Sequence, residues 1–245
     1  MMRVKLTVAY DGTAYHGWQF QKNANTIEAE LNRHLSELLQ EDIQVIGASR
    51  TDAGVHALCN IAVFDTHTQM PADKISYALN QRLPEDIRIQ DSRRVAADFH
   101  PRKCKSIKIY EYKIWRGTFP MPTVRLYSHF MYTPLNVEWM REAAAYLEGK
   151  HDFKSFCSED SQAESTVRTI YGIDLVEAGN MLTIRISGNG FLYNMVRIIA
   201  GTLVECGKGR LPAEKMPDIL EACDRQAAGP TMPARGLTLV EYHFP

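Results

Sequence analysis

The hydrophobic pattern of this chain switches repeatedly between a period of two residues and a period of about 3.6 residues. Apolar residues alternate with polar ones over residues 4–10, which is typical of a half-buried strand. Over residues 27–38 the apolar side chains recur at helical spacing, and Thr26 precedes them in the position of an N-cap. Strands and helices that interchange in this way restrict the chain to folds with mixed layers of sheet and helix.

The same pattern predicts two halves with a similar order of elements. In the first half, strands are expected at 4–10, 42–48, 57–66 and 86–95, and helices at 27–38 and 71–83. In the second half, strands are expected at 107–116, 167–177, 181–187 and 237–243, and helices at 136–148, 191–206 and 213–224. Each half is therefore predicted to be a split β-α-β unit with a mostly antiparallel sheet, in an α/β fold of the α+β type.

The segment 96–106 is the predicted junction, so the two halves comprise residues 1–103 and 104–245. A chain of 245 residues is long enough for two small domains of this kind. Two such sheets side by side would leave a central cleft, and sheets of this kind commonly bind RNA. The architecture alone does not fix a function, because it hosts many unrelated ones.

Composition narrows the setting in which the chain works. The five cysteines are widely spaced and form no CxxC pair, which indicates a reducing, cytoplasmic location and neither a disulfide framework nor a cysteine-based zinc site. No apolar stretch is long enough to span a bilayer, and the N-terminus has no signal-peptide pattern. The net charge of −1 gives no general attraction to phosphates, but residues 102–116 are locally basic. That segment can line a positive groove or form a solvated strand face.

The run GASRTDAGVHA, residues 47–57, is a loop between two predicted strands in which small residues surround Arg50 and Asp52. Its glycines permit unusual backbone angles and a close approach of a ligand. A hairpin turn with a surface ion pair is the plain alternative. A phosphate-binding loop is disfavoured, because the run does not end in GK[ST]. A metal site made of Asp52, His56 and another histidine is also disfavoured, because these residues show no recognised ligand spacing.

Three further segments carry candidate functional residues. Residues 10–21 combine a turn with Tyr15, Trp18 and Phe20, which suit either base stacking or a packed core. In the strand 107–116, Tyr110 shares a face with a lysine, as in a base-stacking platform or a packed strand edge. Arg197 lies in an otherwise apolar helix, where it either pairs with an acid such as Asp52 or is solvated at the helix edge.

Together these segments resemble the tRNA pseudouridine synthases of the A type. The matching segments, in chain order, are YDGTAYHGWQ, GASRTDAGVHA, the stretch from Phe99-His100 to Tyr110-Glu111-Tyr112, HDFKSF at 151–156, VRTI at 167–170 and NGFLYNMVR at 189–197. The resemblance extends from about residue 3 to 243, and the block RTDAGVHA is its most specific part. Cys59 and Asn60 depart from the pattern, because the family usually has Gly and Gln at these two positions.

The resemblance implies an enzyme that isomerises uridine to pseudouridine in the anticodon stem-loop of tRNA. It also implies that each chain has two similar halves flanking a basic cleft and that two chains form a homodimer. No metal and no organic cofactor is implied. By the same resemblance Asp52 matches the catalytic aspartate and Arg50 the arginine that assists base flipping. Tyr110 matches the tyrosine that packs on the target base, and Arg197 the basic residue that pairs with the aspartate.

Two functions of other classes remain as alternatives at the level of the sequence. A catalytically silent RNA-binding protein could use the same sheets, but a binding module has no need of a carboxylate such as Asp52 near phosphates. A metal-dependent hydrolase could use Asp52 and His56, and its activity would be lost in a chelator. The identity of the RNA, and of the uridine within it, is left open.

Overall fold

The computed structural model describes residues 1–159 and 163–244, which divide into two compact units. The first unit contains residues 1–105 together with 239–244, and the second contains residues 106–238. The two units are described separately below. Each combines helices with mostly antiparallel strands, so the predicted fold class is confirmed.

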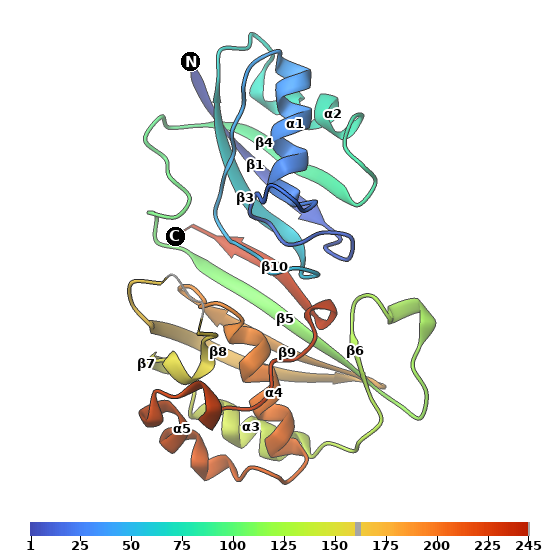
Figure 1. Ribbon diagram of the computed structural model, residues 1–245, viewed down its shortest axis with the longest axis vertical. Coiled ribbons are helices and arrows are strands. Elements are labelled where there is room, and N and C mark those ends of the chain that lie inside the picture. The colour runs from blue at the N-terminus through green and yellow to red at the C-terminus, as the bar shows by residue number, and fades with distance from the viewer. Residues whose placement is uncertain (160–162, 245) are drawn as a thin grey trace. The chain divides into compact units, whose positions relative to one another are not determined.

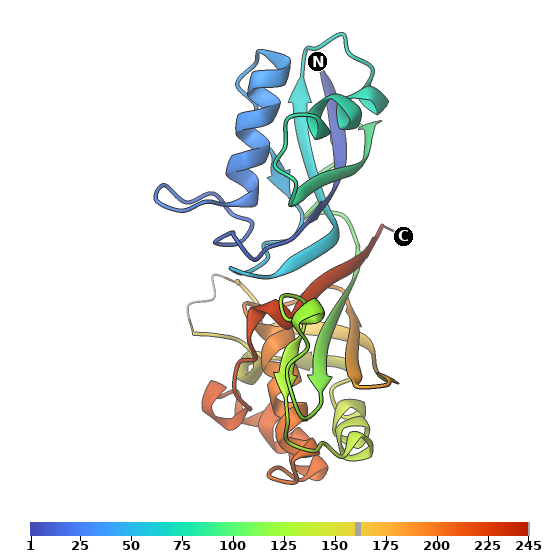
Figure 2. The same cartoon turned by 90° about the vertical axis from the view of Figure 1, so that its right-hand side faces the viewer.

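The first unit is built on strands in the order β4-β1-β3-β10, with the short strand β2 paired to β3. Its elements are β1 (Met2–Tyr10), α1 (Ile27–Leu39), β2 (Ile46–Gly47), β3 (His56–Thr66), α2 (Ala72–Asn80), β4 (Ile87–Val95) and, from residue 239 on, β10 (Leu237–His243). The pairs β1–β3 and β1–β4 are antiparallel. Both helices lie on one face of these strands (Figure 1). Figure 2 shows α1 on this face, next to β1 and β3.

The period-two pattern explains how β1 is buried. Val4, Leu6 and Val8 are fully buried, whereas the residues between them are only half-buried. One face of the strand therefore packs under the helices, as alternation predicts. The helix α1 begins where expected, because the Thr26 hydroxyl accepts a hydrogen bond from the backbone N–H of Ala29 at 3.3 Å.

The second unit is built on strands in the order β5-β9-β8-β7, with the short strand β6 paired in parallel to β5. Its elements are β5 (Ile107–Arg116), β6 (His129–Met131), α3 (Val137–Ala145), β7 (Gly149–Asp152), β8 (Val167–Ala178), β9 (Met181–Gly188), α4 (Met195–Gly207) and α5 (Met216–Ala222). The helix α4 packs against both β5 and α3, and α3 also packs against β8. Most residues of α4 are buried, which makes it the central helix of this unit.

Several predicted elements are shorter in the structure, each for a local reason. The strand expected at 42–48 shrinks to β2, because the backbone N–H groups of Ile43 and Val45 bond to side chains of α1 instead of to a strand. The helix expected from 191 begins only at Met195, because Asn194 has a φ of 61°. Pro217, within the first turn of α5, cannot donate a backbone hydrogen bond, and the preceding turn is a 3₁₀ helix.

Most of the last strand, β10, belongs to the first unit, whereas the sequence predicts it in the second half. The sequence placed everything from 104 to 245 in the second half, but residues 239–244 belong to the first unit. The reason is that β10 pairs with β3, where β1 takes one edge and the short β2 covers only residues 62–63 of the other. No described helix is long and apolar enough to cross a membrane.

Candidate active site

The segment that follows β1 and the loop 47–57 hold each other in place. The backbone N–H of Trp18 donates to the carbonyl of Thr51 at 3.0 Å, and that of Gly54 donates to the carbonyl of Tyr15 at 3.2 Å. Tyr15 and Trp18 are almost completely buried. Two of the three aromatic residues considered for base stacking are therefore core residues of the first unit.

Glycines make this close contact possible at two points. A Cβ on Gly47 would lie only 2.1 Å from the indole nitrogen of Trp18, so only glycine fits there. Residues 52–55 form a tight turn, closed by a 3.1 Å bond from the N–H of Val55 to the carbonyl of Asp52. Gly54, the third residue of this turn, has a φ of 76°, which glycine adopts without strain. The sequence run is thus a shaped loop pressed against a tryptophan.

A buried polar network lies beneath the loop. The hydroxyl of Tyr10 is 2.7 Å from the hydroxyl of Thr51 and accepts the side-chain amide of Asn60 at 3.3 Å. The same amide bonds both backbone groups of Ser49, donating to its carbonyl at 2.9 Å and accepting from its N–H at 3.2 Å. All four residues are less than a tenth exposed. Their bonds connect β1 and β3 to the two residues that flank Arg50.

Asp52 itself is half-buried in the loop, between buried Thr51 and exposed Ala53. Burial raises the pKa of the Tyr10 phenol, and the negative charge of Asp52 raises it further. The phenol therefore stays protonated and available as a hydrogen-bond donor beneath the loop. Asp52 and the exposed Arg50 stand two positions apart on this loop, so a carboxylate and a cation are available to a substrate bound there.

Arg102 is a second cation at this loop, and its position could not be foreseen from the sequence. Its Nε donates to the carbonyl of Gly47 at 2.7 Å, 55 positions away in the chain. The side chain as a whole is exposed, but partial desolvation of the guanidinium lowers the pKa of Arg102, and repulsion from Arg50 lowers it further. Two mutually repelling cations at one loop favour the binding of an anion such as a phosphate.

His56 closes the loop without forming a metal centre in the described part of the chain. Its Nδ1 lies 3.1 Å from the backbone N–H of Gly12 and 3.1 Å from a carboxylate oxygen of Asp11. Within residues 1–159 and 163–244, no three His, Cys, Asp or Glu side chains are grouped so that they could hold a metal ion. The contacts of His56 tie the end of the loop to the segment that follows β1.

In the second unit, Tyr110 and Arg197 both contact the segment 189–194, Tyr110 through Phe191 and Arg197 through Asn194. The ring of Tyr110 packs edge-on against Phe191, with ring centroids 5.2 Å apart. Tyr110 is 7% exposed, so only a small part of it could meet a base. Its neighbour on the same strand face, Tyr112, is fully buried and donates its hydroxyl to the carbonyl of Pro233 at 2.9 Å.

Arg197 is anchored in the first turn of α4 and does not extend freely from the helix edge. Its Nε donates to the carbonyl of Met232 at 2.6 Å, and its guanidinium also donates to the side-chain oxygen of Asn194 at 2.6 Å. Asn194 in turn donates to the hydroxyl of Ser158 at 2.9 Å. These contacts fix the direction of the guanidinium. The expected pair between Arg197 and Asp52 joins residues of different units and stays a prediction.

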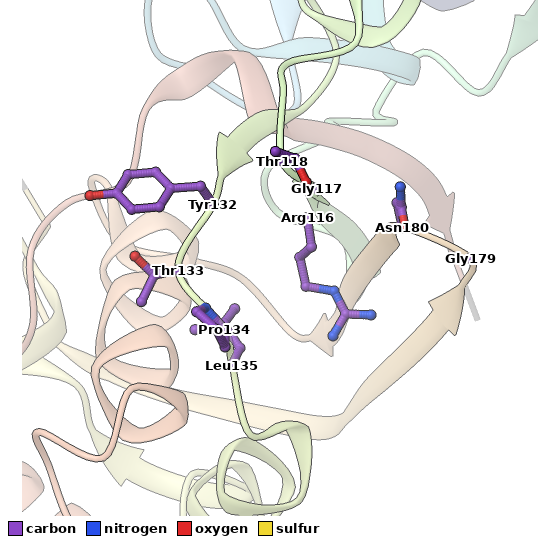
Figure 3. A pocket seen from close by; sticks show the side chains of 9 residues that line it. All are labelled: Arg116, Gly117, Thr118, Tyr132, Thr133, Pro134, Leu135, Gly179 and Asn180. Carbon is purple, nitrogen blue, oxygen red and sulfur yellow. The ribbon is translucent and has the colours of Figure 1, made fainter.

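An open pocket of about 660 Å³ lies elsewhere in the second unit. It is lined by Arg116, Gly117, Thr118, Tyr132, Thr133, Pro134, Leu135, Gly179 and Asn180, and Figure 3 shows Arg116 at the end of β5 near the turn at Asn180. Tyr110 stands six residues earlier on β5, which corresponds to about 20 Å along a strand. This pocket contains none of the predicted site residues.

The sequence has clear relatives among known proteins. A family model described as tRNA pseudouridine synthase matches residues 6–102 and 143–245. The chain is 47% identical over 245 residues to a protein of Ruminiclostridium cellulolyticum named tRNA pseudouridine synthase A, and the match covers 100% of both chains. It is 46% identical over 241 residues to a protein of the same name from Thermoanaerobacter sp. strain X514, covering 98% of this chain and 99% of that one. The likeness extends over both units.

Proposed function

Because this chain belongs to the family of tRNA pseudouridine synthases, we propose that Asp52 is the catalytic residue with which it converts uridine to pseudouridine in tRNA. Membership of the family identifies the reaction, and the structure of the loop 47–57 supports the choice of Asp52 as the residue. The observation that carries the assignment is the half-buried Asp52, two positions from Arg50 in a loop whose backbone is fixed by buried hydrogen bonds.

The reaction explains why a fixed carboxylate is needed. The N1–C1′ bond of uridine breaks, the uracil turns, and a C5–C1′ bond forms while C5 loses its proton. The target nucleotide has to leave its helical stack to be reached. An ionised carboxylate can attack the sugar or the base, or it can take a proton from the sugar. In each case Asp52 has to be ionised, and a cation near it favours that form.

The other three predicted residues are assigned supporting roles. Arg50 is exposed on the same loop, where its guanidinium can take the place of the flipped base or hold a phosphate. Tyr110, held by its contact with Phe191, is proposed to pack against the target base through the small part of it that is exposed. Arg197 is held by Asn194 and the carbonyl of Met232, and we propose that it pairs with Asp52 when the enzyme is active.

Three finer statements are proposed from the family resemblance. The modified uridine lies in the anticodon stem-loop, the enzyme is a homodimer, and it works in the cytoplasm. The five cysteines are widely spaced in the sequence and are free thiols, which supports a reducing compartment. Mapping the modified position in tRNA by a pseudouridine-specific reverse-transcription stop tests the first statement, and the mass of the protein in solution tests the second.

The test of Asp52 uses tritium release from tRNA labelled at C5 of uridine. Asp52→Asn is isosteric and cannot ionise, so release is expected to fall by on the order of 10³-fold or more while tRNA binding remains. The exposed Asp42 lies in the same unit, and Asp42→Asn is expected to release tritium at the wild-type rate. Release by the Asp52→Asn protein at the rate of the wild type would overturn the assignment, and binding without release by the wild type would indicate a silent RNA-binding protein.

A further inference from the structure

The strongest unassigned feature is the buried network beneath the loop. Asn60 is fully buried, and its side chain uses its entire hydrogen-bonding capacity. Its amide N–H groups bond the carbonyl of Ser49 and the hydroxyl of Tyr10, and its oxygen accepts from the backbone N–H groups of Ser49 and Ile61. Because both backbone groups of Ser49 are bound by one planar amide, the chain is held rigidly just before Arg50.

The network continues to the residue beside the carboxylate. Since the Tyr10 hydroxyl accepts a bond from Asn60, its proton is available for the hydroxyl of Thr51, 2.7 Å away. The carbonyl of Thr51 is fixed separately by the backbone N–H of Trp18. The turn closed between Asp52 and Val55 fixes the chain on the other side. The backbone of Asp52 is thus held from both directions, and only its own side-chain torsions remain.

We propose that Tyr10, Thr51 and Asn60 are positioning residues, which hold the carboxylate of Asp52 where the isomerisation needs it. The inference rests on the proposed role of Asp52 and adds how its position is set. None of the three side chains is exposed by more than a tenth, so they act through the loop and not by touching RNA. A displacement of about 1 Å in a reacting group costs on the order of 10² in rate, so loss of one bond should be measurable.

The sequence contains a matched control for the threonine. Thr66 stands at the far end of β3 and is also buried, with its hydroxyl donating to Glu41 at 2.8 Å. Ten residues separate it from His56, which corresponds to about 33 Å along the strand. Thr66→Val and Thr51→Val remove the same group from similarly buried sites, and only Thr51 is bonded to the network.

The experiment measures the single-turnover rate of tritium release and the dissociation constant for tRNA separately. Thr51→Val and Tyr10→Phe are expected to lower the rate on the order of 10²-fold and to leave the dissociation constant unchanged. Thr51→Ser keeps the hydroxyl and is expected to restore the rate, whereas Thr66→Val leaves it at the wild-type value. The double variant of Tyr10 and Thr51 should be no slower than the worse single one, because both remove the same hydrogen bond.

Each outcome decides between the two hypotheses. If Asp52→Asn abolishes release but Tyr10→Phe releases at the wild-type rate, the positioning role is wrong and the role of Asp52 stands. If Asp52→Asn remains active, the proposed function itself fails. An equal loss in Thr51→Val and Thr66→Val would show a general effect of stability and overturn the positioning role. Should Thr51→Val not fold, Tyr10→Phe decides alone, because it deletes one oxygen and keeps the ring.

Discussion

Asn194 shows how one residue can combine a backbone task with a functional one. Its φ of 61° places it in the left-handed region, and it precedes the first residue of α4. Residues other than glycine and asparagine pay on the order of 1 kcal/mol to adopt this conformation. At the same time its side chain accepts a hydrogen bond from the guanidinium of Arg197. The two tasks can be separated by substitution.

Asn194→Gly is expected to lower the rate of pseudouridine formation while costing little stability. Glycine adopts the left-handed conformation freely, but the side chain that bonds the Arg197 guanidinium and the Ser158 hydroxyl is lost, while the bond from Arg197 to the carbonyl of Met232 remains. Asn194→Ala loses the same partner and adds about 1 kcal/mol of backbone strain. Urea unfolding measures the stability of both variants, and single-turnover tritium release measures their rates. Wild-type rates in both would show that Asn194 does not orient Arg197.

The sequence points to the proposed catalytic residue better than it points to the residues that support it. Asp52 could be proposed because its loop has an uncommon composition and lies within residues 6–102, which match the family model. Tyr10 could not be linked to it, because it stands 41 positions before Thr51. Asn60 is near in sequence but lies on a strand, and its bond to Tyr10 spans 50 positions. Such contacts follow only from the register of β1 on β3. Asn60 departs from the usual residue of the family at its position, and this departure is the only sign of it in the sequence.

At the scale of elements, the pairing of β1 with β3 is reinforced by an ion pair across the two strands. Arg3 stands directly opposite Asp65, and its guanidinium bonds both carboxylate oxygens at 2.9 and 2.6 Å. These bonds hold the pKa of Asp65 below its ordinary value of 3.8. The ionised form is therefore the one that the folded state prefers.

The sign of this shift sets a pH dependence. A carboxyl group whose pKa is lower when folded stabilises the fold above its unfolded pKa, and the effect is lost as the pH falls through the folded pKa. The difference in unfolding free energy between wild type and Asp65→Asn should be on the order of 1 kcal/mol at pH 7 and should shrink as the pH falls below 3.8. Urea unfolding titrations at several pH values, run without guanidinium salts, measure this difference in unfolding free energy.

Asp73→Asn is the matched control, because Asp73 pairs with Lys74 on the surface with both side chains more than half exposed. Its effect on the unfolding free energy is expected to be close to zero at every pH. A difference for Asp65→Asn that grows as the solution becomes more acidic would contradict the assigned ion pair.

Elements with long periodic patterns could be predicted from the sequence, and those made by tertiary contact could not. The alternation in β1 and the cap of Thr26 are local properties, and both are confirmed. By contrast, β6 and β7 are three and four residues long and have no pattern of their own. β2 is short because α1 side chains take the backbone groups that a longer strand would use.

At the scale of the whole chain, the C-terminal strand is the feature that local patterns could not assign. A strand at 237–243 follows from alternation, but the choice of neighbour does not. Leu239 is fully buried, and residues 239–244 belong to the first unit although more than 130 residues separate them from residue 105. The first unit is therefore completed only when residues 239–244 have been made.

This assignment predicts which tryptophan reports the loss of Leu239. Trp18 belongs to the first unit and Trp115 to the second, so variants that keep one tryptophan report one unit each. Leu239→Ala is expected to lower the stability reported by Trp18 by about 2–5 kcal/mol, the usual cost of such a truncation in a core. Leu220→Ala in α5 removes the same group from the second unit and should act on the transition reported by Trp115. Urea unfolding followed by fluorescence measures both. If Leu239→Ala moved only the transition reported by Trp115, the last strand would be a structural part of the second unit.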